Sequence, residues 1–220
     1  MANTILRNLA VSILLGAAAI ASGTQETAFA ATIKFDDLVY GVTSYSYDAD
    51  GDGKNDVTFS TADPSGFRTA GPGTNMSYIQ QPGIEGTSLL DVDLRVDFLI
   101  GALNNLKFSY ALNSGSENPS TWASFKVFDS NNNLLTSIFQ SGQYTYPGSY
   151  PSNYPEGVMG VGFTGVASYG LFDFSSDYGR YIIDNFEVTP VPEPVSVLGT
   201  LAFGCWSLAL SKKRKHKSAN

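Results

Sequence analysis

The sequence predicts an all-β protein, a two-sheet β-sandwich or jelly roll, and three observations lead to this prediction. Between residues 32 and 189 no stretch repeats its apolar residues at the helical period, whereas short runs of β-branched and aromatic residues recur. Clusters of Gly, Asn, Asp, Ser and Pro separate these runs at regular spacing. Aromatic residues, which favour strands, are frequent, with 12 Tyr and 14 Phe among 220 residues. We therefore expect one β domain over residues 31–190, flanked by terminal segments 1–30 and 191–220.

About ten or eleven strands are expected in this domain, because that many runs combine strand-forming residues with turn signals on both sides. The expected strands are 33–35, 39–47, 57–59, 77–79, 94–98, 106–112, 125–127, 134–139, 158–163, 169–174 and 181–188. The Asp-Ser-Asn-Asn-Asn run at 129–133 predicts a turn between two of them.

Residues 1–30 have the three parts of a secretory signal peptide. Arg7 supplies the positive charge, residues 9–21 form the apolar stretch, and Ala28-Phe29-Ala30 is a site for cleavage by signal peptidase after Ala30. The alternative is an uncleaved membrane anchor, but the apolar stretch is short compared with the roughly 20 residues of a membrane span. The sequence therefore predicts export. Since residues 32–190 contain no Cys, the domain is expected to fold without disulfides.

The other terminus predicts a short transmembrane helix. Pro192, Glu193 and Pro194 precede the apolar residues 195–210, which a basic cluster at 212–217 follows. Sixteen helical residues at 1.5 Å each span about 24 Å, somewhat less than a hydrocarbon core of about 30 Å. The basic tail is expected to remain cytoplasmic. A buried core helix is the alternative, but no other helix is predicted for it to pack against.

A Pro-Glu-Pro motif, a short apolar segment and a terminal basic cluster, in this order over residues 191–220, resemble the PEP-CTERM sorting signal. The resemblance implies a temporary anchor recognised by an exosortase, a membrane transpeptidase that cuts near the Pro-Glu-Pro motif. The processed protein would then be released or attached to surface polysaccharide. We therefore expect transport across the inner membrane, anchoring through the C-terminal helix, and a final location at the cell surface or in the extracellular matrix.

Residues 48–56 follow the pattern D-x-D-x-D-G-x-x-D, in which closely spaced carboxylates can surround Ca²⁺. The expected ligands are Asp48, Asp50, Asp52, Lys54 through its backbone carbonyl, and Asp56. The pattern matches the first nine positions of an EF-hand loop, but Phe59 replaces the Glu of the twelfth position. The segment thus resembles the calcium loops of dockerins, thrombospondin type 3 repeats and integrin-like propellers, and predicts a weak site with Kd of about 10⁻⁴–10⁻³ M. The alternative is a solvated Asp-Gly hairpin turn without an ion.

Residues 143–156 contain four Tyr and three Pro, which predicts a long, stiff loop because Pro cannot donate to a sheet. Its aromatic side chains are candidates for contact with a glycan. These residues are Tyr144, Tyr146, Tyr150 and Tyr154. The alternative is a loop whose rings pack onto the domain. Trp122 is expected in the core, and the run 182–188 resembles the last strand of jelly-roll carbohydrate-binding modules.

The charge and the histidine content restrict the classes of function that the domain can have. Residues 32–190 contain 18 acidic and 7 basic residues, a net charge of −11 that disfavours nucleic-acid binding. The only His, His216, lies in the basic tail, so catalysis by a Ser-His-Asp or Cys-His arrangement is not expected in the domain. A glycosidase with a carboxylate pair is the remaining enzymatic alternative. Most acidic residues, however, are expected in the 48–56 loop or facing outward along strands, and none lies in a recognisable catalytic motif. We therefore expect a non-enzymatic, calcium-stabilised structural or adhesive component of an exopolysaccharide matrix; the alternative is a carbohydrate-binding module with a defined glycan site.

Overall fold

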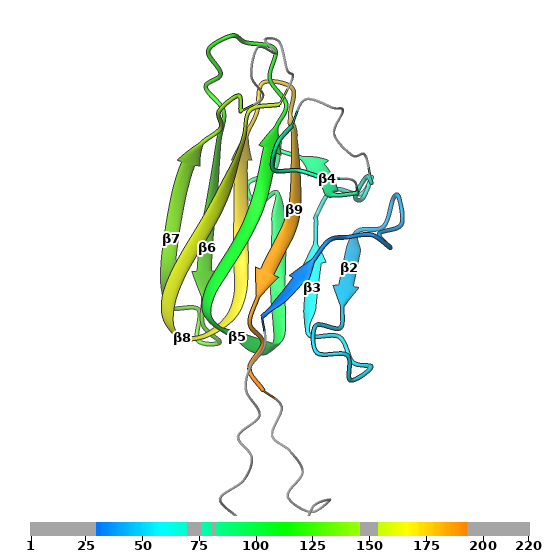
Figure 1. Ribbon diagram of the computed structural model, residues 1–220, viewed down its shortest axis with the longest axis vertical. Helices are drawn as coiled ribbons and strands as arrows, with labels where there is room; N and C mark the ends of the chain where they lie inside the picture. Colours follow the sequence, from blue (N-terminus) through cyan, green and yellow to red (C-terminus); the bar gives the residue numbers. More distant parts are fainter. Residues whose placement is uncertain (1–29, 70–75, 81, 146–153, 193–220) are drawn as a thin grey trace, which may run out of the picture. The chain divides into compact units, whose positions relative to one another are not determined.

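The computed structural model describes residues 30–69, 76–80, 82–145 and 154–192, and these form strands and loops without a helix (Figure 1). The strands are β1 (Ala31–Ile33), β2 (Ser44–Tyr47), β3 (Val57–Ser60), β4 (Ile84–Thr87), β5 (Leu94–Leu112), β6 (Trp122–Phe128), β7 (Leu134–Ser141), β8 (Glu156–Ser175) and β9 (Arg180–Val188). Within these ranges no helix is long and apolar enough to cross a membrane. The expected signal peptide, the expected helix at 195–210, Glu193 and Pro194 lie outside the described residues.

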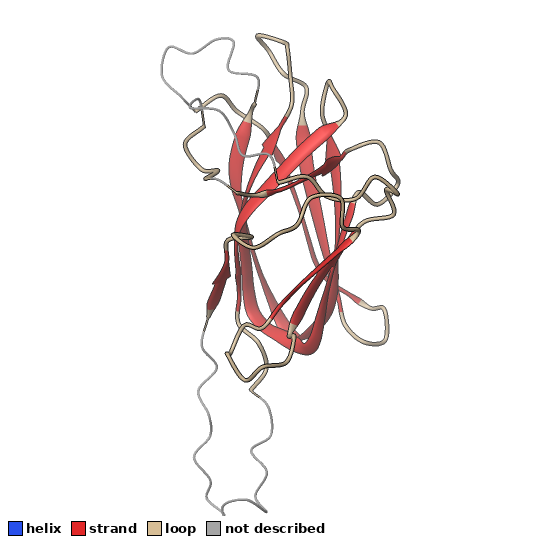
Figure 2. Ribbon diagram, turned by 90° about the vertical axis from the view of Figure 1, so that its right-hand side faces the viewer, coloured by secondary structure: helices blue, strands red, loops and turns tan. Residues whose placement is uncertain are grey.

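The strands form one hydrogen-bonded sheet that folds over into two layers, as Figure 2 shows from the side. The long antiparallel strands β5 and β8 pair with each other and run through both layers. In one layer the first part of β5 pairs with β3, and the last part of β8 pairs with β6. In the other layer the last part of β5 pairs with β9, which also pairs with β1 and β4. The predicted all-β class is confirmed, and the two layers give the domain its sandwich form.

Residues with left-handed backbone conformation allow the two long strands to bend between the layers. In β5, Gly101 has a φ of 88° and Asn104 a φ of 62°, and the pairing with β8 shifts register in this region. In β8, Gly165 has a φ of 96°. Gly adopts this conformation without the steric cost that a Cβ imposes. At Gly101 a Cβ would also lie only 2.5 Å from the side chain of Val166. The bend therefore requires Gly at this position.

Phenylalanine rings from both layers meet in the core. Phe59 of β3 contacts Phe186 of β9 edge-on, with ring centroids 5.1 Å apart. Phe108 of β5 contacts Phe125 of β6 at 5.3 Å and Phe172 of β8 at 5.0 Å, again edge-on. Edge-to-face pairs of this kind add about 0.5–1.5 kcal/mol beyond the burial of their area. These inter-layer contacts hold the folded-over sheet together.

The nine strands differ from the expected ten or eleven in two ways. Two of the observed strands each combine two expected ones, because the long strands continue through their bends. The expected strands 94–98 and 106–112 are both parts of β5, and 158–163 and 169–174 are both parts of β8. The expected strand 77–79 is wrong, since that segment is a loop, and β4 at Ile84–Thr87 is the strand that pairs with β9 instead. In β4, Ile84 and Thr87 favour strands but Glu85 and Gly86 do not, so this short run gives no clear strand signal without its pairing to β9.

Most acidic side chains outside the 48–56 loop are exposed or half-buried, as expected, but four are buried. The four are Glu85, Asp93, Glu156 and Asp184. Glu156 accepts hydrogen bonds from the backbone nitrogens of Ser77 at 2.6 Å and Tyr78 at 2.9 Å. Asp184 accepts one from the backbone nitrogen of Gln80 at 2.8 Å. Buried carboxylates need such donors to offset lost hydration, and here they attach the 76–80 segment to the sheet.

Candidate functional site

The predicted calcium loop lies at the end of the hairpin formed by β2 and β3, whose register runs from Ser44↔Ser60 to Tyr47↔Val57. Asp48 organises the loop, because its Oδ1 and Oδ2 accept hydrogen bonds from the backbone nitrogens of Gly51 at 2.6 Å and Gly53 at 2.7 Å. Gly51 and Gly53 have φ values of 82° and 90°, which favour Gly. The two glycines therefore let the backbone curl around the first carboxylate.

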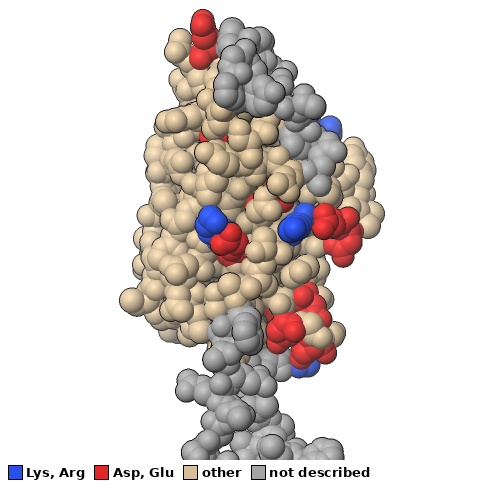
Figure 3. Space-filling model, viewed as in Figure 1, with Lys and Arg blue, Asp and Glu red and all other residues tan. Residues whose placement is uncertain are grey.

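Three of the expected ligands come together. Carboxylate oxygens of Asp48, Asp50 and Asp56 lie within 4.8 Å of one another, so a single cation can contact all three. Asp50 is exposed, Asp48 is half-buried and Asp56 is 1% exposed. Figure 3 shows a group of acidic side chains at the lower right of the face in view, below a second acidic group that lies beside a basic side chain. We call Asp48, Asp50 and Asp56 the aspartate triad.

Asp56 is the member of the triad in which one carboxylate oxygen lacks a hydrogen-bond partner. Its Oδ2 accepts hydrogen bonds from the backbone nitrogens of Ala49 at 2.7 Å and Asp50 at 3.2 Å. Its Oδ1 is buried and has no hydrogen-bond partner among the described residues. Burial raises the pKa of Asp56, the nearby charges of Asp50 and Asp48 act in the same direction, and the two backbone donors partly oppose the shift. A buried acceptor without a partner is costly, and a cation would supply one.

Asp52 and Lys54, also expected as ligands, pair with each other. The Lys54 ammonium lies 2.7 Å from Asp52 Oδ2, and the Lys54 backbone nitrogen donates to Asp52 Oδ1 at 2.8 Å. The hydrogen bond from the ammonium, followed by that from the backbone, lowers the pKa of Asp52. Asp52 does not belong to the group of convergent carboxylates. The loop can thus offer a cation three carboxylates, with further oxygens from the backbone or water.

The described tyrosines of the 143–156 loop are attached to the domain. Tyr144 Oη donates a hydrogen bond to the Ser116 carbonyl at 2.7 Å. Tyr154 is half-buried and packs against a small cluster of Ile79, Ala111 and Ile182. Burial raises the pKa of its phenol, the charge of Glu85 adds to the shift, and Arg180 opposes it. Tyr146 and Tyr150 lie outside the described residues. A glycan contact through this loop remains a prediction.

A second candidate site was not predicted from the sequence. Residues 63–68, β4 and the turn before β9 enclose a cavity of about 250 Å³. It is lined by Asp63, Ser65, Gly66, Arg68, Gly86, Thr87, Leu89, Tyr178, Gly179 and Arg180, which we call the arginine pocket. Its two arginines are more than a hundred positions apart in the sequence, and no local pattern around either of them indicates a site.

Comparisons with known proteins do not assign a family. No protein-family model and no curated protein matches the chain. Among solved structures, the chain is similar to the K3 cleaved adhesin domain of Lys-gingipain from Porphyromonas gingivalis, with 15% identity over 72% of this chain and 97% of that chain and a TM-score of 0.39. It is also similar to the CBM22-1-CBM22-2 tandem domain of Paenibacillus barcinonensis Xyn10C, with 10% identity over 79% of this chain and 49% of that chain and a TM-score of 0.38. With TM-scores below 0.5, these similarities identify neither a fold family nor a ligand.

Proposed function

We propose that this protein is exported, sorted to the cell surface, and serves there as a structural or adhesive component of an exopolysaccharide matrix, with Ca²⁺ stabilising the loop between β2 and β3. The export and sorting steps are supported by the sequence features of residues 1–30 and 191–220, including Pro192, Glu193 and Pro194. Signal peptidase and an exosortase are the processing partners in this proposal. The domain needs no disulfide, because it contains no Cys between residues 32 and 190.

The observation that most supports a calcium-stabilised domain is the buried, unpartnered Oδ1 of Asp56 within the aspartate triad. Three carboxylates brought within 4.8 Å repel one another unless a cation lies between them. Hard oxygen ligands suit Ca²⁺, and a weak site is filled at the calcium concentrations that extracellular modules meet. The metal's role is structural: it would hold the hairpin end in one conformation, and no reaction step depends on it.

The intact mass of the extracellular form tests the export and sorting proposal. Cleavage after Ala30 and near the Pro-Glu-Pro motif predicts a chain that begins at Ala31 and ends close to residue 192. Deleting residues 191–220 should prevent retention in the membrane fraction before release. Recovery of the full-length chain as the sole form, soluble in the cytosol, would overturn the proposal.

The second candidate function is a carbohydrate-binding module with a defined glycan site, and the arginine pocket is the observation that favours it. Affinity gel electrophoresis against a panel of polysaccharides distinguishes the candidates. A module should be retarded by one class of glycan, and substitutions at its site should abolish this retardation. If Ala substitutions at Tyr146, Tyr150 and Tyr154 abolish it, the glycan contacts the tyrosine loop. If they leave it unchanged while pocket substitutions abolish it, the arginine pocket is the site.

A further inference from the structure

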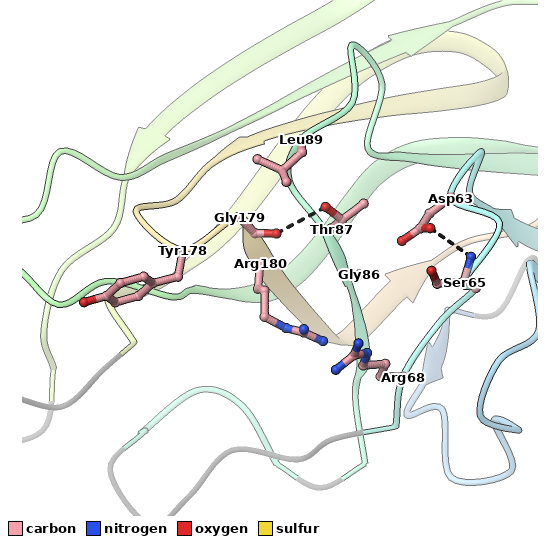
Figure 4. A pocket seen from close by; sticks show the side chains of 10 residues that line it. Asp63, Ser65, Arg68, Gly86, Thr87, Leu89, Tyr178, Gly179 and Arg180 are labelled. Atoms are coloured by element: carbon pink, nitrogen blue, oxygen red, sulfur yellow. Dashed lines mark hydrogen bonds between the residues drawn. The ribbon is translucent and has the colours of Figure 1, made fainter.

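The arginine pocket brings together side chains from three neighbouring segments of the chain. Arg68 pairs through its backbone with Glu85 of β4, and Thr87 of β4 pairs with Arg180 of β9. Directly paired residues in antiparallel strands share a face, as do residues two apart along a strand. Arg68, Glu85, Thr87 and Arg180 therefore project from the same face of this part of the sheet. Figure 4 shows the side chains of Arg68 and Arg180 pointing toward one another.

Two arginines and the carboxylates of Glu85 and Asp63 leave this site without net charge, but among the described residues only Arg180 of the two arginines is ion-paired. Arg180 forms an ion pair with the Glu85 carboxylate, which is buried. Arg68 is exposed, and no carboxylate of the described residues lies within ion-pair distance of it. Arg180 pairs with Glu85 through its Nε, so its terminal nitrogens and the Arg68 guanidinium can still bind a further anion. A guanidinium binds a carboxylate through two parallel hydrogen bonds, so a single carboxylate can bridge such a pair.

The rest of the pocket offers polar groups suited to hydroxyls. Asp63 Oδ1 accepts a hydrogen bond from the Ser65 backbone nitrogen at 2.9 Å, and its second oxygen can accept another. The hydroxyls of Ser65 and Thr87 also line the pocket, and Thr87 Oγ1 donates to the Gly179 carbonyl at 3.3 Å. Leu89, 78% exposed, adds an apolar rim. The fitting ligand therefore carries one carboxylate, several hydroxyls and a small apolar surface.

The volume restricts the size of this ligand. About 250 Å³ is slightly below the range of roughly 300–1,000 Å³ that is typical of sites for drug-sized molecules. A single sugar unit is compatible with such a space, whereas a longer oligosaccharide would have to extend beyond it. Two of the seven basic residues between positions 32 and 190 line this one pocket of an otherwise acidic domain.

We propose that the arginine pocket binds one carboxylate-bearing sugar unit, a uronate, of an acidic polysaccharide. The sugar carboxylate bridges Arg68 and Arg180, and its hydroxyls bond to Asp63, Ser65 and Thr87. The inference rests on the proposed function, which places the protein among exopolysaccharides. A single small sugar in an acidic domain binds weakly, with Kd of about 1 mM, so retention in a matrix would come from many copies along one polymer.

Titration of the full-length chain in detergent with trigalacturonate, followed by NMR, tests this proposal. EDTA is present throughout, so that calcium chelation by the sugar cannot act through the loop between β2 and β3. Galactotriose serves as the neutral ligand of equal length, and a sulfated galactan trisaccharide as the other anionic one. We expect binding of trigalacturonate, with shifts at Arg68, Thr87 and Arg180, and at least tenfold weaker binding of galactotriose.

Variants assign the effect to the pocket. Arg68→Gln should weaken trigalacturonate binding by about tenfold or more, because it removes a charge-assisted bidentate contact. Lys126→Gln, the matched control, removes one exposed charge from β6 and should leave the affinity unchanged. Arg180→Lys keeps a cation beside Glu85 but loses the planar fork, and should also weaken binding. Circular dichroism checks that each variant is folded.

Several results would overturn the proposal: no binding of trigalacturonate, equal binding of galactotriose, or an unchanged affinity in both arginine variants. Tighter binding of the sulfated trisaccharide would overturn the assignment to a carboxylate. Because the titration uses soluble sugar and unprocessed protein, its failure leaves the export and sorting proposal standing. Equally, an unprocessed cellular form would overturn that proposal without changing the titration.

Discussion

Replacing Asp50 by Asn should abolish the response of the protein to calcium. Asp50 is exposed and belongs to the aspartate triad, and its Oδ1 accepts a hydrogen bond from the Asp52 backbone nitrogen at 3.0 Å. Asn preserves the shape and this acceptor but removes one negative charge and one oxygen ligand. Asp52→Asn is the matched control: it makes the same chemical change in the same loop, at a carboxylate that pairs with Lys54.

The size of the effect follows from binding linkage. A ligand at 10 to 100 times its Kd stabilises the folded state by about 1.4 to 2.7 kcal/mol, which is the range for a weak extracellular site at about 10 mM Ca²⁺. For a domain of this size each kcal/mol raises the Tm by about 2–4 °C, so calcium should raise it by roughly 3–10 °C. The Asp50→Asn variant should shift by less than about 1 °C, while Asp52→Asn should keep the full shift.

Thermal unfolding followed by circular dichroism, with calcium or with EDTA, measures the calcium-induced Tm shift of the unmodified protein and of each variant. In EDTA the Asp50→Asn variant should be at least as stable as the unmodified protein, because it relieves repulsion between carboxylates. An unmodified protein whose Tm does not respond to calcium would refute the calcium site. Equal loss of the response in both variants would refute the distinction between the triad and the Asp52–Lys54 pair.

Three further predictions concern the stability of the domain. Burial raises the pKa of Asp93 from 3.8 to about 6. Between these pH values the folded protein binds a proton at Asp93 that the unfolded chain does not bind, so the free energy of unfolding in EDTA should rise as the pH falls. Asp93 should contribute about 1 kcal/mol of this rise between pH 7 and pH 5. Urea unfolding at the two pH values measures this difference, which Asp93→Asn should reduce by that amount. Phe108→Ala should lower the free energy of unfolding by about 3–5 kcal/mol, because the ring is fully buried between the layers. Phe139→Ala is the control and should lower it by less than about 1 kcal/mol, because this ring is 62% exposed. Gly101→Ala should lower the free energy of unfolding by more than about 1 kcal/mol, because the φ of Gly101 is positive. Gly160→Ala is the control and should be close to neutral, because a Cβ at that position would meet nothing within 4 Å. A similar cost at both positions would contradict the explanation of the bend in β5.

Local sequence patterns predicted some elements well. The turn at 129–133 between β6 and β7 is present: Asp129 Oδ1 accepts hydrogen bonds from the backbone nitrogens of Asn131 and Asn133, each at 2.8 Å. Asn132 has a φ of 64°, a conformation that Asn adopts more readily than most residues. Such turns depend on contacts within a few residues, so the sequence contains the information that forms them.

The position of Trp122 could not be predicted in this way. The sequence favoured the core, but Trp122 is half-buried on the outer face, where its ring lies 5.3 Å from that of Phe139. The inward positions of β6 belong to Ala123, Phe125 and Val127, which are fully buried. A shift of one residue exchanges the two faces of a strand, and only the packing of the opposite layer decides between them.

By itself, the sequence determined the all-β class and the acidic loop at 48–56, because each depends on the composition or spacing of neighbouring residues. Only the tertiary structure decided that Asp56 is buried while Asp50 remains exposed. It also brought Arg68 beside Arg180 through the pairing of both segments with β4. Burial and charge proximity arise from contacts between segments distant in the chain, and these depend on how the sheet folds over rather than on any local pattern.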